Sequence, residues 1–153
     1  MTILKFVKTS YKLPDNLLIT SNLSEVFDEI KKFNGKVLLT SKKHQSGTDR
    51  IWEAFKKIED KKIRYIINLQ GDEPTINISD IRRLNKIAVK NNFDICTLAS
   101  RLKNNKSLSD KNIVKLTTNK KIDHYSPSKV KSFTRNLKKR NNKTYQHIGI
   151  YHY

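Results

Sequence analysis

Two short polar blocks, each directly after an apolar run that is typical of a strand, carry the residues most suited to chemistry. The first block is His44-Gln45-Ser46-Gly47-Thr48-Asp49-Arg50, which offers hydroxyls, an amide and a glycine. The second is Gln70-Gly71-Asp72-Glu73-Pro74, which offers adjacent carboxylates. Open α/β folds bind ligands at the carboxyl ends of their strands, so both blocks are expected at that edge of a sheet. Together they predict a nucleotide held beside a metal ion.

Asp72 is the candidate metal ligand of the second block. A carboxylate at the end of a strand suits a hard cation such as Mg²⁺, which keeps several waters and takes few protein ligands. Glu73 either orients the surrounding groups or folds back structurally. From the residues alone, a plain turn role for Asp72, satisfying nearby backbone amides, is an equally open interpretation.

The first block leads into a predicted helix that Thr48 can cap. Gly47 permits close approach of the backbone, and the start of a helix favours anionic or polar ligand groups. An ordinary N-cap and turn is the alternative, and both roles can hold at once. Arg50 is expected to brace the loop, and His44 to have a structural role.

Strands and helices alternate ahead of Ser100, as in an α/β protein. Strands are predicted over residues 16–20, 36–40, 63–69 and 94–99. Helices are predicted from Asn22 or Ser24 through Phe33, from Thr48 through Ile58, and from Asn77 or Ser79 onwards. Because the connections are short, the pattern favours a mostly parallel sheet covered by helices, a three-layer α/β/α architecture.

The pattern changes after Ser100. The segments Ile113–Thr117 and Lys121–Tyr125 predict a hairpin, and 126–144 is expected to be an exposed basic loop or a poorly formed helix. A strand is predicted over 146–153. The whole chain is therefore interpreted as one domain, with its core at 15–100, a hairpin and basic loop at 101–145, and the terminal strand.

The composition predicts a folded, strongly basic protein. Apolar residues make up 36% of the 153 and are concentrated in runs, whereas 32 basic and 14 acidic residues give a net charge of +18. Such a charge attracts polyanions, but it is dispersed along most of the chain. A nucleotide- or nucleic-acid-binding module is the less favoured alternative. Its candidate residues are Lys129, Lys131, Arg135, Lys138, Lys139, Arg140 and Lys143.

The remaining features point to a cytoplasmic protein. Cys96 is the only cysteine, which excludes an intramolecular disulfide and favours a reducing compartment. It lies in a predicted strand, where a packing role is favoured. No apolar stretch approaches the ~20 residues of a transmembrane helix, and the start of the chain lacks the apolar core of a secretory signal.

Taken together, these motifs resemble those of the cytidylyltransferases that activate 3-deoxy-manno-octulosonate (Kdo), the CMP-Kdo synthetases. The resemblance runs from about Leu17 to Tyr153. It rests on Leu18–Asn22, the two polar blocks, Asn112–Lys115, Tyr125-Ser126 and His147–Tyr151. It implies a Rossmann-like nucleotidyltransferase fold, and a reaction that joins CTP and Kdo into CMP-Kdo, releasing pyrophosphate, with Mg²⁺ as cofactor.

The resemblance also implies roles for individual residues. Asp72 is the implied catalytic metal ligand. The residues implied to hold CTP are Gln45, Ser46, Gly47, Thr48 and Gln70. His147, Gly149 and Tyr151 are implied to face the sugar acid, and strand alternation places all three on one side of the terminal strand.

Three departures from the family pattern suggest a domain truncated at both ends. The family's basic triphosphate loop is only faintly matched by Lys8–Pro14, and its dimerisation element and second metal-binding Asp belong to sequence beyond Tyr153. Its Ser-Arg pair after the hairpin reads Ser126-Pro127 here, without the cation. The chain alone is therefore expected to be weakly active or inactive. A non-catalytic remnant, or half of a split enzyme completed by another chain, is the alternative. The partners considered are that complementing chain or a second copy in a homodimer.

Overall fold

A computed structural model of the protein describes residues 18–70, 76–102 and 106–153. The chain divides into two compact units: unit 1 comprises Met1–Arg64 with Gln70–Pro74, and unit 2 comprises Tyr65–Leu69 with Thr75–Tyr153. The predicted metal ligand Asp72 lies outside the described residues. The assignment of the whole chain to a single domain stays a prediction.

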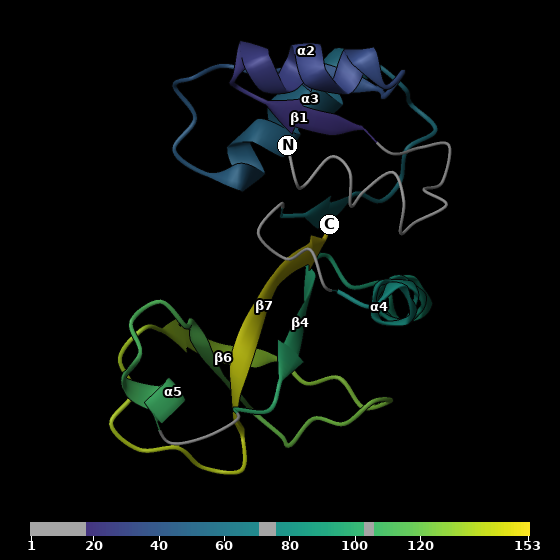
Figure 1. Ribbon diagram of the computed structural model, residues 1–153. Coiled ribbons are helices and arrows are strands. Elements are labelled where there is room, and N and C mark those ends of the chain that lie inside the picture. Colours follow the sequence, from purple (N-terminus) through teal and green to yellow (C-terminus); the bar gives the residue numbers. More distant parts are fainter. Residues whose placement is uncertain (1–17, 71–75, 103–105) are drawn as a thin grey trace. The chain divides into compact units, whose positions relative to one another are not determined.

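Unit 1 contains a two-stranded parallel sheet whose strands are connected by a helix. Strand β1 (Ile19–Ser21) pairs with β2 (Val37–Leu39), and helix α2 (Ser24–Lys32) joins them along the chain. Helix α3 (Gly47–Ile58) follows β2 (Figure 1). Both helices have an apolar face, and each buries a residue of that face, Ile30 in α2 and Ala54 in α3.

The turn after helix α2 contains an asparagine in the left-handed conformation and a glycine that packs closely against the helix. Asn34 has the left-handed backbone, with φ 55°. The Gly35 amide then donates to the Ile30 carbonyl at 3.0 Å. A Cβ atom on Gly35 would lie 2.5 Å from Ile30 Cγ2, and Ile30 is only 2% exposed. The glycine is therefore required by packing.

Replacing Gly35 by alanine is expected to lower the free energy of unfolding by about 1–3 kcal/mol, because the added methyl group overpacks a buried, branched side chain. Urea denaturation followed by circular dichroism measures the change. Asn34→Gly is the matched control, since it removes a side chain from the left-handed position, and its stability should stay within about 1 kcal/mol of the wild type. Equal losses in both variants would contradict the packing explanation.

Unit 2 is a five-stranded sheet built around the terminal strand β7 (Thr144–His152). His152 pairs both with Ile67 of β3 (Ile67–Leu69) and with Cys96 of β4 (Cys96–Ser100), so β7 lies between these two strands. Further along, β7 pairs with β5 (Lys115–Thr118), which in turn pairs with β6 (Val130–Thr134). Figure 1 shows β7 running beside β4.

Two helices complete the part of unit 2 that the structure describes. Helix α4 (Ile78–Asn91) starts at its N-cap Asn77, whose side-chain oxygen accepts from the Ser79 amide at 2.9 Å. It buries Leu84 and Ala88. The short helix α5 (Lys106–Ser109), which the sequence pattern did not predict, follows β4 along the chain. The buried Leu116 and Ile150 of the sheet and the apolar face of α4 make up much of the core of this unit.

The α/β class with an antiparallel hairpin near the C-terminus is confirmed, but the strand directions differ from the predicted pattern. Among the described pairings only β1 and β2 are parallel, whereas every pair in unit 2 is antiparallel. The reason is the terminal strand, which lies between β3 and β4 and runs opposite to both. Alternating strands and helices alone do not show such an insertion.

The hairpin has a different second strand from the one predicted. Strand β5 pairs with β6 at Val130–Thr134, inside the segment that was expected to be a loop or weak helix, and 121–125 is not a strand. The Asp123 carboxylate instead accepts from the backbone amides of Tyr125 and Ser126, each at 2.8 Å. These two bonds lower the pKa of Asp123 and form a local turn.

Candidate functional site

The loop before α3 presents the predicted CTP-binding residues at the surface. Gln45, Ser46, Gly47 and Thr48 are all exposed. Ser46, rather than the predicted Thr48, caps the helix: its Oγ accepts from the Asp49 amide at 3.1 Å and donates to Asp49 Oδ2 at 2.7 Å. The start of a helix, with a glycine beside it, favours the binding of polar or anionic groups, so this loop can still bind such a ligand.

Glu53 of α3 holds the loop in place through contacts with its side-chain carboxylate. Its carboxylate accepts from the Ser41 amide at 2.9 Å, contacts Lys57 Nζ at 2.6 Å and pairs with His44 Nε2. The bond from Lys57, followed by those from Ser41 and His44, lowers the pKa of Glu53 from 4.5 to about 2. His44 therefore has a structural partner.

Arg50 braces the same region, but against the strands rather than within the loop. Its Nη1 donates to Thr40 Oγ1 at 2.8 Å. Thr40 in turn donates through its amide and its hydroxyl to the Ser21 carbonyl, at 2.8 and 3.1 Å. The start of α3 is thus tied to the carboxyl ends of β1 and β2, the edge at which the sequence placed the first block.

The ion pairs of Glu53 predict acid sensitivity in a defined range. Between pH 4.5 and about 2 the unfolded chain carries the proton on Glu53 and the folded chain does not, so stability falls as the pH falls through this window. Above pH 4.5 the contribution is fully present. Glu53→Gln is expected to flatten the pH dependence of the urea midpoint there. Glu25→Gln, an exposed change in α2, should keep the wild-type slope, and an equal flattening in both would contradict this origin.

Only the first residue of the second block, Gln70, is among the described residues. Gln70 directly follows β3 along the chain and is exposed, while Asp72 lies outside the described residues. Within residues 18–70, 76–102 and 106–153, no group of three histidine, cysteine, aspartate or glutamate side chains could hold a metal ion. The assignment of Asp72 as a metal ligand stays a prediction.

Aromatic rings line one face of β7. The His147 and Tyr151 ring centroids lie 5.3 Å apart, so these two predicted sugar-facing residues share a side of the strand. Phe133 of β6 meets His147 edge-on at 5.1 Å, and Tyr153 stacks on Tyr151 at 5.9 Å. Gly149 lies between His147 and Tyr151 on the strand and is half-buried.

Burial controls the ionisation of this aromatic face. It lowers the pKa of His147 below its usual 6.5. Burial, followed by the neighbouring Tyr153, raises the pKa of Tyr151 above 10. Both side chains are therefore neutral at pH 7 and offer hydrogen bonds without a charge.

Two residues beside this face were not found by the sequence analysis. Thr97 of β4 and Asn68 of β3 pair with Tyr151 from its two sides, which places all three side chains on one face. Thr97 Oγ1 lies 2.9 Å from His147 Nε2. Asn68 is 6% exposed, and its Nδ2 is without a partner among the described residues. The apolar composition of both strands gave no signal for these contacts.

Arg135 is a cation that follows the observed hairpin, whereas the expectation of a missing cation rested on the predicted one. That expectation took the hairpin to end at Tyr125. Because the second strand is β6, which ends at Thr134, the residue that directly follows the hairpin is Arg135. Arg135 is exposed, and its Nη1 donates to the Lys111 carbonyl at 2.9 Å. A cation is therefore present directly after the strand whose Phe133 touches His147.

A family described as cytidylyltransferase matches residues 4–153, nearly the whole chain. This chain belongs to the cytidylyltransferase family. The match spans the loop before α3, β3 and the aromatic face of β7, so the geometry described above lies within the family's own sequence pattern. It confirms the resemblance drawn from the two polar blocks and the terminal strand.

Individual relatives of this chain carry a more specific name. The 3-deoxy-manno-octulosonate cytidylyltransferase of Thermodesulfovibrio yellowstonii is 36% identical over 94% of this chain and 60% of the relative. The protein of that name from Rickettsia canadensis is 32% identical over 95% of this chain and 58% of the relative. The chain thus spans about three-fifths of the length of these relatives.

A solved structure of a CMP:2-keto-3-deoxy-manno-octonic acid synthetase, complexed with CTP, has a similar fold. It superposes with a TM-score of 0.78 at 25% identity, over 99% of this chain and 62% of that one. This agreement confirms the nucleotidyltransferase fold. No helix in the described parts of this chain is long and apolar enough to cross a membrane.

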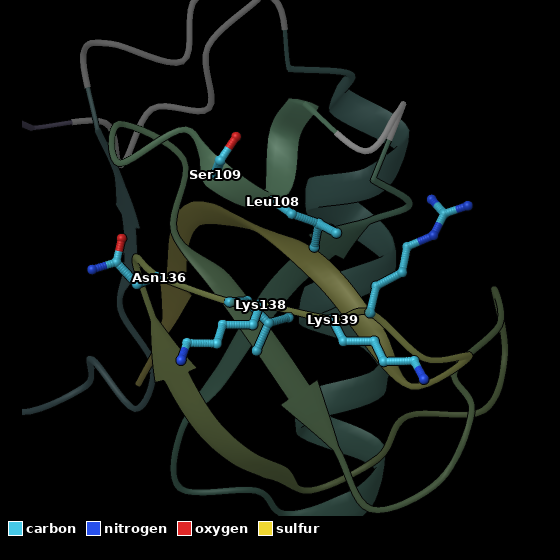
Figure 2. Close-up of a pocket in the computed structure, with 7 residues that line it drawn as sticks. Leu108, Ser109, Asn136, Lys138 and Lys139 are labelled. Carbon is cyan, nitrogen blue, oxygen red and sulfur yellow. The ribbon is translucent and has the colours of Figure 1, made fainter.

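A pocket of about 840 Å³ lies in unit 2, between α5 and the segment 136–140 (Figure 2). Its lining includes Leu108, Lys138, Lys139 and Arg140. Figure 2 shows the amino groups of Lys138 and Lys139 pointing to opposite sides. The amino groups of Lys138 and Lys139 therefore do not converge on one anion.

Proposed function

We propose that this chain forms the CTP- and sugar-acid-binding part of an enzyme that makes CMP-Kdo. In the proposed reaction the anomeric hydroxyl of Kdo attacks the α-phosphorus of CTP, and pyrophosphate leaves. The observation that carries the proposal is the superposition of almost the entire chain on a CTP-bound synthetase of this kind. The names of the sequence relatives support the same substrate pair.

CTP is assigned to the loop before α3. The residues proposed to contact it are Gln45, Ser46, Gly47, Thr48 and Gln70. Ser46 holds the helix start through Asp49, so its hydroxyl acts mainly on the shape of the loop. Glu53 and Arg50 keep this loop against the strand ends, which preorganises it before the nucleotide arrives.

The donor set of the second block suits Mg²⁺. Asp72 and Glu73 supply carboxylate oxygens, which a hard cation prefers, and Asp72 is the proposed ligand. When bound, Mg²⁺ neutralises charge on the phosphate oxygens. The protein's own contribution is to hold the nucleotide and the sugar in line.

The sugar acid is assigned to the aromatic face of β7. His147, Gly149 and Tyr151 are the proposed contacts, and the two neutral rings offer hydrogen bonds to sugar hydroxyls. A carboxylate additionally needs a cation, and Arg135 is the candidate because it follows Phe133, which touches His147.

The proposal is tested by measuring nucleotide binding and pyrophosphate release with the 153-residue protein. Saturation-transfer NMR should show binding of CTP in preference to ATP, and the binding should strengthen when Mg²⁺ is added. Pyrophosphate release should require CTP, Mg²⁺ and Kdo together. Equal binding of all nucleotides, or release that does not depend on Kdo, would overturn the proposed substrates.

A further inference from the structure

The pairing of β4 with β7 has a β-bulge between Thr97 and Leu98, and this bulge determines which groups the Thr97 hydroxyl contacts. Neighbouring residues Thr97 and Leu98 pair with Tyr151 and Ile148, so Gly149 and Ile150 have no opposite residue on β4. Such bulges re-aim side chains and are frequent beside functional sites. Here the bulge brings the Ile150 carbonyl within 2.7 Å of Thr97 Oγ1.

The number of hydrogens on Thr97, together with its two carbonyl contacts, favours one direction for its contact with His147. A threonine hydroxyl has one hydrogen to donate and two lone pairs that accept. The carbonyls of Ile150 at 2.7 Å and Ile148 at 3.2 Å can only accept a hydrogen bond. If the hydrogen went to His147 Nε2 instead, the Ile150 carbonyl would face the lone pairs of the hydroxyl at 2.7 Å. Donation to a carbonyl is therefore the favoured arrangement, and in it the contact of 2.9 Å to His147 Nε2 is donated by the imidazole ring.

The other ring nitrogen is left as an acceptor. In the neutral imidazole only one nitrogen is protonated, so Nδ1 of His147 presents a lone pair. Among the described residues, the ring contact of His147 with a polar group is the one from Nε2 to Thr97. Phe133 and Tyr151 pack against the ring at 5.1 and 5.3 Å, which restricts its rotation.

We infer that Thr97 is a positioning residue that holds His147 in the Nε2–H form, so that Nδ1 accepts a hydrogen bond from a hydroxyl of the bound sugar acid. The sugar half of this inference rests on the proposed function. A nitrogen lone pair repels a carboxylate, so His147 selects a hydroxyl group, and the carboxylate is left to a cation such as Arg135. The inferred position of the hydrogen on the His147 ring does not depend on any substrate.

Long-range ¹H–¹⁵N NMR of the histidine rings tests the tautomer without any substrate. The His147 signals, assigned by their loss in His147→Gln, should show a protonated Nε2 and an unprotonated Nδ1 at neutral pH. Thr97→Val removes the acceptor and should shift both nitrogens, whereas Thr97→Ser should keep the wild-type signals. Thr117→Val is the matched control, because it removes another strand hydroxyl, one bonded to Ser132.

The wild-type spectrum alone decides whether the tautomer is the inferred one, even where a variant fails to fold. A hydrogen on Nδ1, or Thr97→Val signals equal to those of the wild type, overturns the inference. In a turnover assay Thr97→Val should raise the KM for Kdo about tenfold, the worth of one oriented hydrogen bond, and leave the KM for CTP unchanged. An Nε2–H tautomer in a protein that does not bind Kdo supports the positioning role and rejects the proposed substrate.

Discussion

Replacing Lys115 by alanine is expected to lower the free energy of unfolding by about 3–5 kcal/mol, because a buried ammonium with two hydrogen bonds and its aliphatic stem are lost together. Lys115 begins β5 and is fully buried. Its Nζ donates to the Asp110 carbonyl at 2.5 Å and to the Arg135 carbonyl at 2.8 Å. Hydrogen bonds from a charged donor are worth more than neutral ones, and here the two acceptors lose their donor at once.

The position of Lys115 explains why the effect is large. The side chain links the loop that precedes β5 to the residue that follows β6, so it closes the open end of the hairpin. Urea denaturation measures the loss. Lys111→Ala is the matched control: this exposed lysine contributes only its backbone carbonyl, which accepts from Arg135. A loss below about 1 kcal/mol for Lys115→Ala would show that water replaces the ammonium at both carbonyls.

The elements ahead of Ser100 could be predicted because their apolar residues repeat at helical or strand spacing. Helix α3 is an example, since Ile51, Phe55 and Ile58 fall on one face. Strand β6 could not be predicted in this way. Its exposed Lys131, Ser132 and Phe133 show no apolar alternation, and the strand forms by pairing with β5. That pairing depends on the partner strand, which a local pattern does not include.

In the candidate site too, contacts within one strand could be predicted from the sequence, and contacts between strands could not. That His147 and Tyr151 share a face follows from their spacing on one strand, and the structure brings their rings together. The contact of His147 with Thr97 joins residues 50 positions apart and depends on a bulge between two strands. The burial of Lys115 also has no local signal, because lysine is almost never buried unless other segments supply acceptors.

Asp72→Asn is expected to lower the Mg²⁺-dependent pyrophosphate release by a factor of about 10²–10³, because an amide of the same shape cannot supply the negative charge that holds the cation. The substitution keeps the volume of the side chain and one oxygen, so it tests charge rather than packing. The affinity for CTP should be strengthened by Mg²⁺ in the wild type, and this increase should disappear in the variant. Titration calorimetry with and without Mg²⁺ measures it.

The control for this prediction separates a local metal ligand from the general charge of a protein at +18. Removing any carboxylate raises the net positive charge and strengthens the attraction of CTP by the same nonspecific amount. Asp28→Asn, an exposed change in α2, makes the same charge difference at a residue outside the second polar block and should keep the wild-type response to Mg²⁺. Chelation of Mg²⁺ should bring the wild type to the level of Asp72→Asn, since both remove the same interaction. If the variant retains the full Mg²⁺ response, the cation is held by other groups and Asp72 is a turn residue.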